Sequence, residues 1–469
     1  MHTYAETREY RVMGKDLRPL LDGLCGEVFT AESGGYDAAR ALWNGRFDRR
    51  PALIVRPACA EDVARAVAFA REAGLPVSVR GGGHSLAGFG VADGALALDM
   101  SALKHIRVNP EDATVRAEAG VLAGELDQAL HPHGLAVPVG TISLVGVAGL
   151  TLGGGIGWLT RKYGLTLDNL EAVELVTAEG RALTASERDH PELFWGLRGG
   201  GGNFGVVTAF TFRAQPVPTE VLGGPLFYAL DQAPTALRLL RDIMEGAPEE
   251  LAAMATLMTA PPAAPFPEHM WGRLALAIDL CYAGPEAEGE RALRPLRESG
   301  LHELDIVRRI PFLTRQRSSD GKIRTGHQHD GASRYLQMLS DGAIDALVEA
   351  FARVNSPLHS ARLVSLGGAA ARVPAAATAY PHRGAAYALW LGAVWGPGEP
   401  AAPHRAWMRS ALALMRPYTG DATYVNILSD EGELGVRAAY GHEHYRRLQA
   451  LKRAYDPENR FSSNQNIRP

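Results

Sequence analysis

Residues 77–85 read Val-Ser-Val-Arg-Gly-Gly-Gly-His-Ser, a short β-branched segment that runs into three glycines and one histidine. Because glycine has no Cβ, the backbone N–H groups of Gly81, Gly82 and Gly83 can approach an anion such as a pyrophosphate without steric cost. His84 is then the reactive side chain at the rim of the turn. The pattern predicts a turn that binds a ligand.

Two further glycine clusters occupy the same half of the chain, at residues 153–157 and 199–205, and each adjoins an apolar segment. Three loops that permit close approach predict one long ligand. Residues 200–205 formally satisfy the Gly-x-Gly-x-x-Gly dinucleotide fingerprint. The residues after it, 206–212, form a predicted strand where that motif requires a helix, which excludes the Rossmann interpretation.

Composition limits the class of protein. The 469 residues are 46% hydrophobic and 21% charged with a net charge of -4, so we expect a soluble protein of two domains and no nucleic-acid partner. Cys25, Cys59 and Cys281 are odd in number and far apart, which excludes a fully paired disulfide framework and close-spaced zinc motifs. With no secretory signal and no membrane-spanning run, a reducing, cytoplasmic location and no membrane partner are predicted.

Hydrophobic periodicity predicts an α/β region at the start of the chain and a change of texture after residues 215–218. The predicted helices are 59–72 and 121–130, and the predicted strands are 53–55, 77–79, 95–100, 106–108, 114–117, 171–177 and 204–212. The predicted domains are an N-terminal part of a ligand-binding domain at 1–217, a second domain at 218–415, and a segment at 416–469 that completes the first.

Other motifs carry less weight. Ser85 lies one residue from a nucleophile-elbow pattern, but no helix follows the three glycines to house it. His327 and His329, with Asp330 adjacent, have the spacing of metal ligands on one face of a strand. We favour a solvated loop or a substrate pocket for them and predict no metal site.

Taken together, the motifs resemble the berberine-bridge-enzyme-like branch of the covalent flavoprotein oxidases. The resemblance rests on residues 80–85, 140–141, 145–158, 199–207, 424–426 and 464–466, in order over nearly the whole chain. It implies an α+β, two-domain fold of the vanillyl-alcohol-oxidase or PCMH-type FAD-binding class. An inserted substrate domain, with an antiparallel sheet backed by helices, is part of that fold.

The resemblance implies that FAD is the cofactor and that His84 carries it through an 8α-histidyl link. Many relatives add a link through a cysteine after the Gly-Thr pair, but Ile142 occupies that place, so a single attachment is predicted. The other implied FAD-binding residues are Val79, Arg80, Gly81, Gly82, Gly83, Ser85, Gly140, Thr141, Val145, Gly146, Gly149, Gly153, Gly154, Gly157, Gly202, Asn203, Gly205, Val206, Val207, Asn426, Asn464 and Asn466.

The implied reaction is hydride transfer from a substrate carbon to the flavin, assisted by a base. Relatives often place a catalytic tyrosine after the asparagine of Tyr-x-Asn, but here that residue is Ile427. Tyr424, Tyr380 and Tyr163 are substitutes, and Asn426 belongs to the same catalytic segment. Val145 stands where the family gates the access of oxygen, which predicts oxygen as electron acceptor.

Three functions therefore remain open. The favoured one is an oxidase of a small organic substrate, an alcohol, an amine or a natural-product intermediate, that yields hydrogen peroxide. The second is a flavin-dependent oxygenase or cyclase of a natural product, and the third a binding protein whose flavin is redox-idle. The partners expected are the substrate and O2, in a monomer or homodimer. The aromatic residues Trp271, Trp390 and Trp395 of the second domain favour a planar or apolar substrate.

Overall fold

The strand before the glycine turn lies at the edge of a four-stranded sheet of order β3-β4-β6-β5 in the computed structural model, which describes residues 11–322 and 324–469. Strands β4, β6 and β5 are parallel, whereas β3 pairs antiparallel to β4. Helix α3 (Ala60–Ala73) connects β4 to β5 and ends at Gly74, whose φ of +69° is left-handed. The predicted helix and the predicted strands 53–55, 77–79 and 95–100 are confirmed as α3, β4 (Leu53–Arg56), β5 (Val77–Arg80) and β6 (Leu96–Asp99). Strand β3 (Glu27–Phe29) was not predicted.

A second, antiparallel sheet of order β11-β10-β12-β8-β7 follows in the chain. Its β7–β8 hairpin was predicted from the turn between them. The buried face of α3 shares one hydrophobic core with the first sheet and with Val176 and Val206 of the second. The two sheets are thereby joined through one helix. The bounds are β7 Ile106–Asn109, β8 Thr114–Glu118, β10 Leu170–Val176, β11 Ala182–Ser186 and β12 Val206–Arg213.

The third sheet has eight antiparallel strands between residues 220 and 395, in the order β17-β14-β16-β15-β20-β21-β19, with β18 beside β14. Alternate residues face opposite sides: Leu363 and Leu389 pack under helices, whereas Met254 and Val364 join the core of the glycine-rich half. The strands are β14 Glu220–Ala229, β15 Leu251–Thr259, β16 Leu274–Tyr282, β17 Leu304–Asp305, β18 Arg308–Pro311, β19 Gln328–Leu336, β20 Ser360–Ser365 and β21 Tyr387–Trp395.

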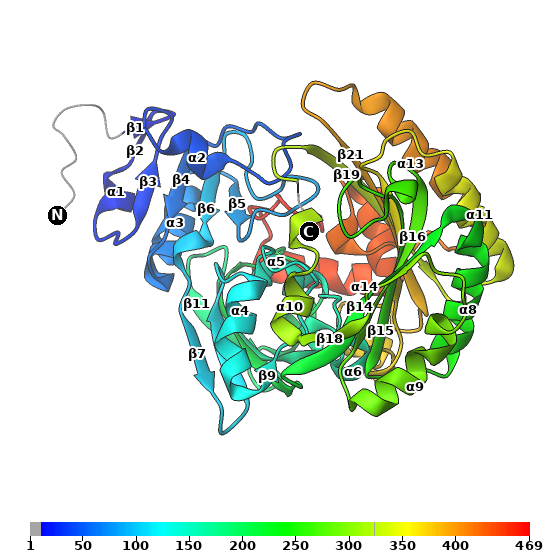
Figure 1. The fold of residues 1–469 in the computed structure, drawn as a ribbon. Coiled ribbons are helices and arrows are strands. Elements are labelled where there is room, and N and C mark those ends of the chain that lie inside the picture. The colour runs from blue at the N-terminus through cyan, green and yellow to red at the C-terminus, as the bar shows by residue number, and fades with distance from the viewer. Residues whose placement is uncertain (1–10, 323) are drawn as a thin grey trace.

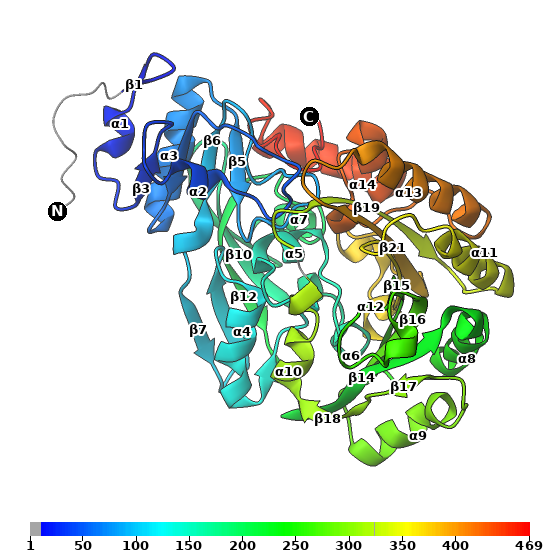
Figure 2. The same cartoon turned by 45° about the horizontal axis from the view of Figure 1, so that its top comes forward.

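The four longest helices of this half cover the outer face of the third sheet. Figures 1 and 2 show α8, α9, α11 and α13 on the side away from the first two sheets, so the other face is turned toward the glycine loops. The predicted α+β class, with an antiparallel sheet backed by helices, is confirmed; the boundaries at 217 and 415 stay a prediction. The helices are α8 Ala233–Glu245, α9 Glu286–Arg297, α11 Asp341–Ala352 and α13 Ala401–Met415.

Shorter elements connect these layers. They are β1 Arg11–Val12, β2 Lys15–Asp16, α1 Arg18–Leu21, α2 Tyr36–Arg40, α4 Ala123–Leu130, β9 Leu135–Ala136, α5 Val147–Gly153, α6 Thr160–Tyr163, α7 Pro191–Leu197, β13 Gln215–Pro216, α10 Phe312–Arg317 and α12 Ala369–Arg372. No helix within the described residues is long and apolar enough to span a bilayer.

The end of the chain returns to its beginning. Helix α14 (Gly432–Tyr455) is interrupted at Gly441, where φ is +70°. Beyond it, the amide of Val77 donates to the carbonyl of Arg460 at 3.1 Å, which places the C-terminal segment beside β5.

A fully buried ion pair secures this return. Lys452 Nζ donates to Asp456 Oδ2 at 2.7 Å and to the carbonyls of Asn203 and Phe461 at 2.9 and 3.0 Å. Both charged side chains are 0% exposed. Burial lowers the pKa of Lys452, and the carboxylate opposes that shift. The pair therefore holds the third glycine cluster against the C-terminal segment.

We predict that Lys452→Met lowers the free energy of unfolding by about 3–5 kcal/mol, because Asp456 is left as an uncompensated buried charge. Urea unfolding followed by circular dichroism measures the change. Arg453→Met, at the exposed neighbouring position, is the control and should change stability by less than about 0.5 kcal/mol. Equal stability of the two variants would contradict this role.

Candidate active site

A cavity of about 420 Å3 lies between the glycine loops, helix α5, the C-terminal segment and the third sheet. Twenty-one of the residues predicted for the site line it. Eighteen come from the three glycine-rich segments and their neighbours: Val79, Arg80, Gly81, Gly82, Gly83, His84, Ser85, Gly140, Thr141, Val145, Gly146, Gly149, Gly153, Gly202, Asn203, Gly205, Val206 and Val207. Tyr424, Asn426 and Asn464 line it from the C-terminal segment.

Two predicted glycines lie outside the cavity lining. A Cβ on Gly157 would stand 1.8 Å from the carbonyl oxygen of Val139, and one on Gly154 would stand 3.0 Å from the Tyr424 ring. Real Cβ atoms do not come as close as 1.8 Å, so packing requires glycine at position 157. At position 154 the φ of +144° also favours glycine, because L side chains rarely adopt it.

Tyr380 and Asn466 are also outside the lining. The Tyr380 hydroxyl is buried and hydrogen-bonded to the hydroxyl of Tyr335 at 2.8 Å. Burial raises the pKa of Tyr380 well above its usual value. The half-buried Asn466 leaves its Oδ1 without a hydrogen-bond partner among the described residues. A direct role of Tyr380 as base stays a prediction, with this placement against it.

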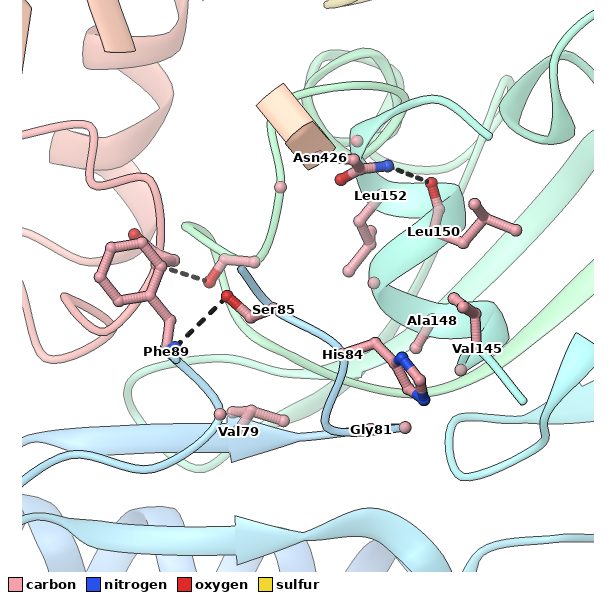
Figure 3. A pocket seen from close by; sticks show the side chains of 18 of the residues that line it. Val79, Gly81, His84, Ser85, Phe89, Val145, Ala148, Leu150, Leu152 and Asn426 are labelled. Carbon is pink, nitrogen blue, oxygen red and sulfur yellow. Dashed lines mark hydrogen bonds between the residues drawn. The ribbon is translucent and has the colours of Figure 1, made fainter. Parts of the chain in front are cut away.

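Gly82 packs against another part of the backbone, a role that the sequence did not indicate. A Cβ on Gly82 would lie 2.3 Å from the amide nitrogen of Gly146, and a Cβ on Gly146 would lie 2.4 Å from that of Gly82. Two backbones therefore touch here, and the approach of this turn to an anion stays a prediction. Gly83 has a φ of +72°. Ser85 Oγ accepts the Phe89 amide at 3.3 Å, a turn-closing bond visible in Figure 3.

His84 projects from this turn beside Val145 (Figure 3). Its ring stacks on Trp43, with centroids 5.2 Å apart and planes at 21°, and Trp43 packs in turn on His329 at 3.9 Å. Burial, aided by the positive charges that His329 and Arg80 contribute, lowers the pKa of His84 to about 4. The imidazole is therefore neutral at pH 7 and offers a nitrogen lone pair.

Asn44 is a buried hub that links the His84 turn to the third sheet. Its Nδ2 donates to the carbonyls of Leu86 and His329 at 2.8 and 2.9 Å, and its Oδ1 accepts the amide of His329 at 3.0 Å. The adjacent Trp43 lines the cavity. Sequence analysis missed both residues, because they belong to no motif and precede the first predicted strand.

Tyr424 and Asn426 form a hydrogen-bonded pair under the second glycine cluster. The Tyr424 hydroxyl accepts the amide of Gly155 at 2.9 Å and Asn426 Nδ2 at 3.0 Å. Asn426 Nδ2 also donates to the carbonyl of Leu150 at 3.0 Å, as Figure 3 shows. Burial raises the pKa of Tyr424 to about 12, so its phenol is protonated at neutral pH. Ile427, beside them, lines the cavity with a hydrophobic side chain.

The histidines considered as metal ligands have protein partners. His329 Nε2 hydrogen-bonds the carbonyl of Arg324 at 2.9 Å, and Asp330 pairs with Arg405 at 2.7 Å. His327 is half-buried on the preceding loop. These residues form no three-ligand cluster among the described residues.

Two cysteines that are far apart in the sequence lie close together in the structure. Cys25, Cys59 and Asp62, far apart in the chain, bring their ligand atoms within 4.8 Å of one another. Both Asp62 oxygens already accept backbone amides, those of Cys25 at 3.0 Å and Ala58 at 2.9 Å. Both cysteines are free thiols. The group lies next to the β3–β4 pair and is occupied in joining two loops.

Comparison with known proteins agrees with this geometry. Residues 51–186 match the model of an FAD binding domain, and residues 423–468 match the berberine and berberine-like model. The (R)-6-hydroxynicotine oxidase of Paenarthrobacter nicotinovorans is 33% identical, with 95% of this chain and 97% of the relative covered. The chain belongs to the berberine-bridge-enzyme-like family of FAD-linked oxidoreductases.

Two more members of this family support the assignment. The FAD-linked oxidoreductase YgaK of Bacillus subtilis is 32% identical, over 95% of this chain and 97% of its own length. The crystal structure of 6-hydroxy-D-nicotine oxidase from Arthrobacter nicotinovorans superposes with a TM-score of 0.85 at 29% identity, covering 97% of this chain and 100% of that one. The predicted family, fold and FAD-linked oxidoreductase class are confirmed.

The cavity fits FAD on its own chemistry. Trp43 Nε1, Arg80 Nε and Asn464 Oδ1 belong to residues that line it and are buried polar atoms without a partner among the described residues. A Cβ on Gly149 or Gly202 would meet nothing within 4 Å, so the backbone there is open to a ligand. No carboxylate is among the described residues of the lining, which suits a pyrophosphate.

We predict that Gly82→Ala destabilises the protein by about 1–3 kcal/mol, because the new methyl group forces the two backbones apart. The flavin content of the purified protein, measured as absorbance at the flavin band relative to protein, should fall with it. Gly34→Ala is the control, since a Cβ there meets nothing within 4 Å. Full flavin content in the Gly82 variant would show that the contact is dispensable.

Proposed function

We propose that this protein is an oxidase of a small organic substrate, with FAD held by a single 8α-histidyl link to His84. The observation that carries the proposal is the neutral imidazole of His84, stacked on Trp43 and projecting into the cavity from the glycine turn. FAD bound in this cavity would supply the acceptor for a hydride from the substrate, and its two electrons would go on to O2 to give hydrogen peroxide.

Attachment of FAD to His84 is an oxidation that releases two protons and two electrons. The His84 nitrogen forms a bond to the 8α carbon, one methyl hydrogen and the imidazole N–H hydrogen are lost as protons, and the two electrons released reduce O2 to hydrogen peroxide. A neutral imidazole is needed for this step, and Arg80 and His329 help to keep it neutral. Ile142 lines the cavity where many relatives carry a cysteine, so we propose no second link.

The low pKa of His84 predicts how the attachment of flavin depends on pH. Because burial lowers it to about 4, the neutral form persists well below the usual value of 6.5. Apoprotein mixed with FAD should therefore attach flavin at a constant rate from pH 8 down to pH 5, and more slowly only near pH 4. In-gel flavin fluorescence after acid denaturation measures the bound fraction.

His84→Ala is the matched control and should release all of its flavin on denaturation. A rate of attachment that falls with a midpoint near 6.5 would contradict the environment described for His84. Flavin that stays bound in the His84→Ala variant would contradict the site of attachment.

The proposed use of oxygen rests on Val145. This residue lines the cavity on the segment between Ile142 and helix α5, and its amide donates to the carbonyl of Ile142 at 3.4 Å. A small side chain at this position of the family goes with reaction of the reduced flavin with oxygen. We propose that Val145 leaves this path open.

Val145→Leu should slow reoxidation of the substrate-reduced enzyme by at least about tenfold, equal to about 1.4 kcal/mol of barrier, because the larger side chain fills the path. Rapid mixing of anaerobically reduced protein with oxygenated buffer measures it. Val145→Ala should reoxidise at least as fast as the parent. Equal rates in all three proteins would show that oxygen arrives by another route.

The position where many relatives carry a catalytic tyrosine holds Ile427, which cannot act as a base. Asn426 is placed to position Tyr424, and the phenol of Tyr424 is protonated at neutral pH. With Ile427 in the tyrosine position and no carboxylate in the described lining, an oxygenase or cyclase of natural products is the second candidate. Oxygen-18 from O2 that appears in the product, in place of peroxide, would favour it. We propose residues 218–415 as the substrate domain for either reaction.

A further inference from the structure

Two side chains of the third sheet line the cavity. Of the described residues of the eight strands, only Arg362 of β20 and Trp390 of β21 are part of the lining. They are direct partners across the two strands, and Thr256 of β15 pairs with Arg362 on its other side. The three side chains form one row on the face that is turned toward the glycine loops. The remaining lining comes from residues 43, 77–207 and 424–465.

Arg362 has no charged partner. Its Nε donates to Thr256 Oγ1 at 3.2 Å, and it forms no ion pair within the described part of the chain. The other arginine of the lining, Arg80, is paired with Asp99 at 3.2 Å. Half-buried charges without a partner are costly and are retained at sites that bind an opposite charge. The guanidinium of Arg362 is therefore available to bind an anionic group of a ligand.

Neighbouring acids do not fill this role. Asp279 of β16 lies on the same face and attracts Arg362 at a distance, but Arg315 Nη2 already donates to its Oδ1 at 2.7 Å. Burial lowers the pKa of Arg362, and Asp279 opposes the shift only in part. Arginine stays protonated in proteins nevertheless. An anionic oxygen in the cavity would supply the charged partner that Arg362 lacks within the sheet.

Trp390 supplies the second feature of this wall. Its ring is stacked with Tyr424, with centroids 6.1 Å apart and planes at 16°. Its side chain lines the cavity next to Arg362. A planar group placed against the indole would bring an attached anionic oxygen within reach of the guanidinium.

We propose that Arg362 determines substrate specificity by binding an anionic oxygen of the substrate, a carboxylate or an ionised phenol or enol, next to the aromatic wall of Trp390. This inference rests on the proposed function, since it names the substrate class of that site. Where the anion is a phenol or enol oxygen conjugated to the reacting carbon, its proton has already passed to solvent, and no base is needed to remove it.

The test is binding of small aromatic probes to the flavin-loaded protein without turnover. Benzoate, 4-cyanophenolate and neutral benzamide are titrated while the flavin absorbance is followed, for the wild type and for Arg362→Met. We expect one or both anions to bind the wild type at least about tenfold more tightly than benzamide does, and Arg362→Met to lose about tenfold to a hundredfold of that affinity. Benzoate and 4-cyanophenolate distinguish the two sources of the anionic oxygen.

Arg334→Met is the matched control, because Arg334 lies on β19 of the same sheet, outside the cavity lining, and its Nη1 donates to the carbonyl of Ser333. It should bind the anions like the wild type, and Arg362→Lys should retain part of the affinity. Near-ultraviolet circular dichroism and flavin content confirm that each variant is folded.

Four results would overturn the proposal. The first three are failure of both anions to bind the loaded wild type, affinity of neither anion above that of benzamide, and unchanged anion affinity in Arg362→Met. A fourth is a shift of the ligand-free flavin spectrum and of sulfite affinity in Arg362→Met, which would assign the guanidinium to the flavin. Release of flavin from denatured wild type would instead contradict the His84 link and leave this inference untouched.

Discussion

The contact between the backbones of Gly82 and Gly146 is the constraint on which the site depends. Neither residue has room for a Cβ, since each would place one within 2.4 Å of the other's amide nitrogen. The turn after β5 is thereby held against the start of α5, which fixes His84 beside Val145. A proposed point of attachment and a proposed path for oxygen thus lie side by side because two main chains meet without side chains between them.

Buried polar hubs then draw distant segments to this contact. Asn44 connects the His84 turn to β19, Lys452 connects the third glycine cluster to the C-terminal segment, and Tyr424 connects the third sheet to the second glycine cluster. In each hub the polar atoms named above are hydrogen-bonded, as buried groups require. Against this background, four cavity residues have buried polar atoms without a partner among the described residues: Trp43, Arg80, Trp390 and Asn464. Arg362, which has no ion-pair partner in the described part of the chain, joins them as a residue available to ligands.

Local pattern was enough to predict much of the fold. Apolar spacing placed α3, and β-branched residues placed β5 and β10, because these signals are carried by neighbours in the chain. The glycine clusters and the Tyr-x-Asn segment likewise indicated the family and most of the cavity lining. Trp43 and Arg362 escaped prediction, since the first lies in an irregular segment and the second faces the cavity only through the register of β20. The proximity of Cys25 to Cys59 is a product of tertiary folding for the same reason.

The central claim is a covalent bond between His84 and FAD, and peptide mapping tests it most directly. Trypsin cleaves after Arg80 and Lys104, so His84 lies in the peptide of residues 81–104. Mass spectrometry of the digested yellow protein should find this peptide heavier by FAD less two hydrogens, with fragmentation that places the addition on His84. Recovery of the unmodified peptide from protein that is fully loaded with flavin would contradict the account.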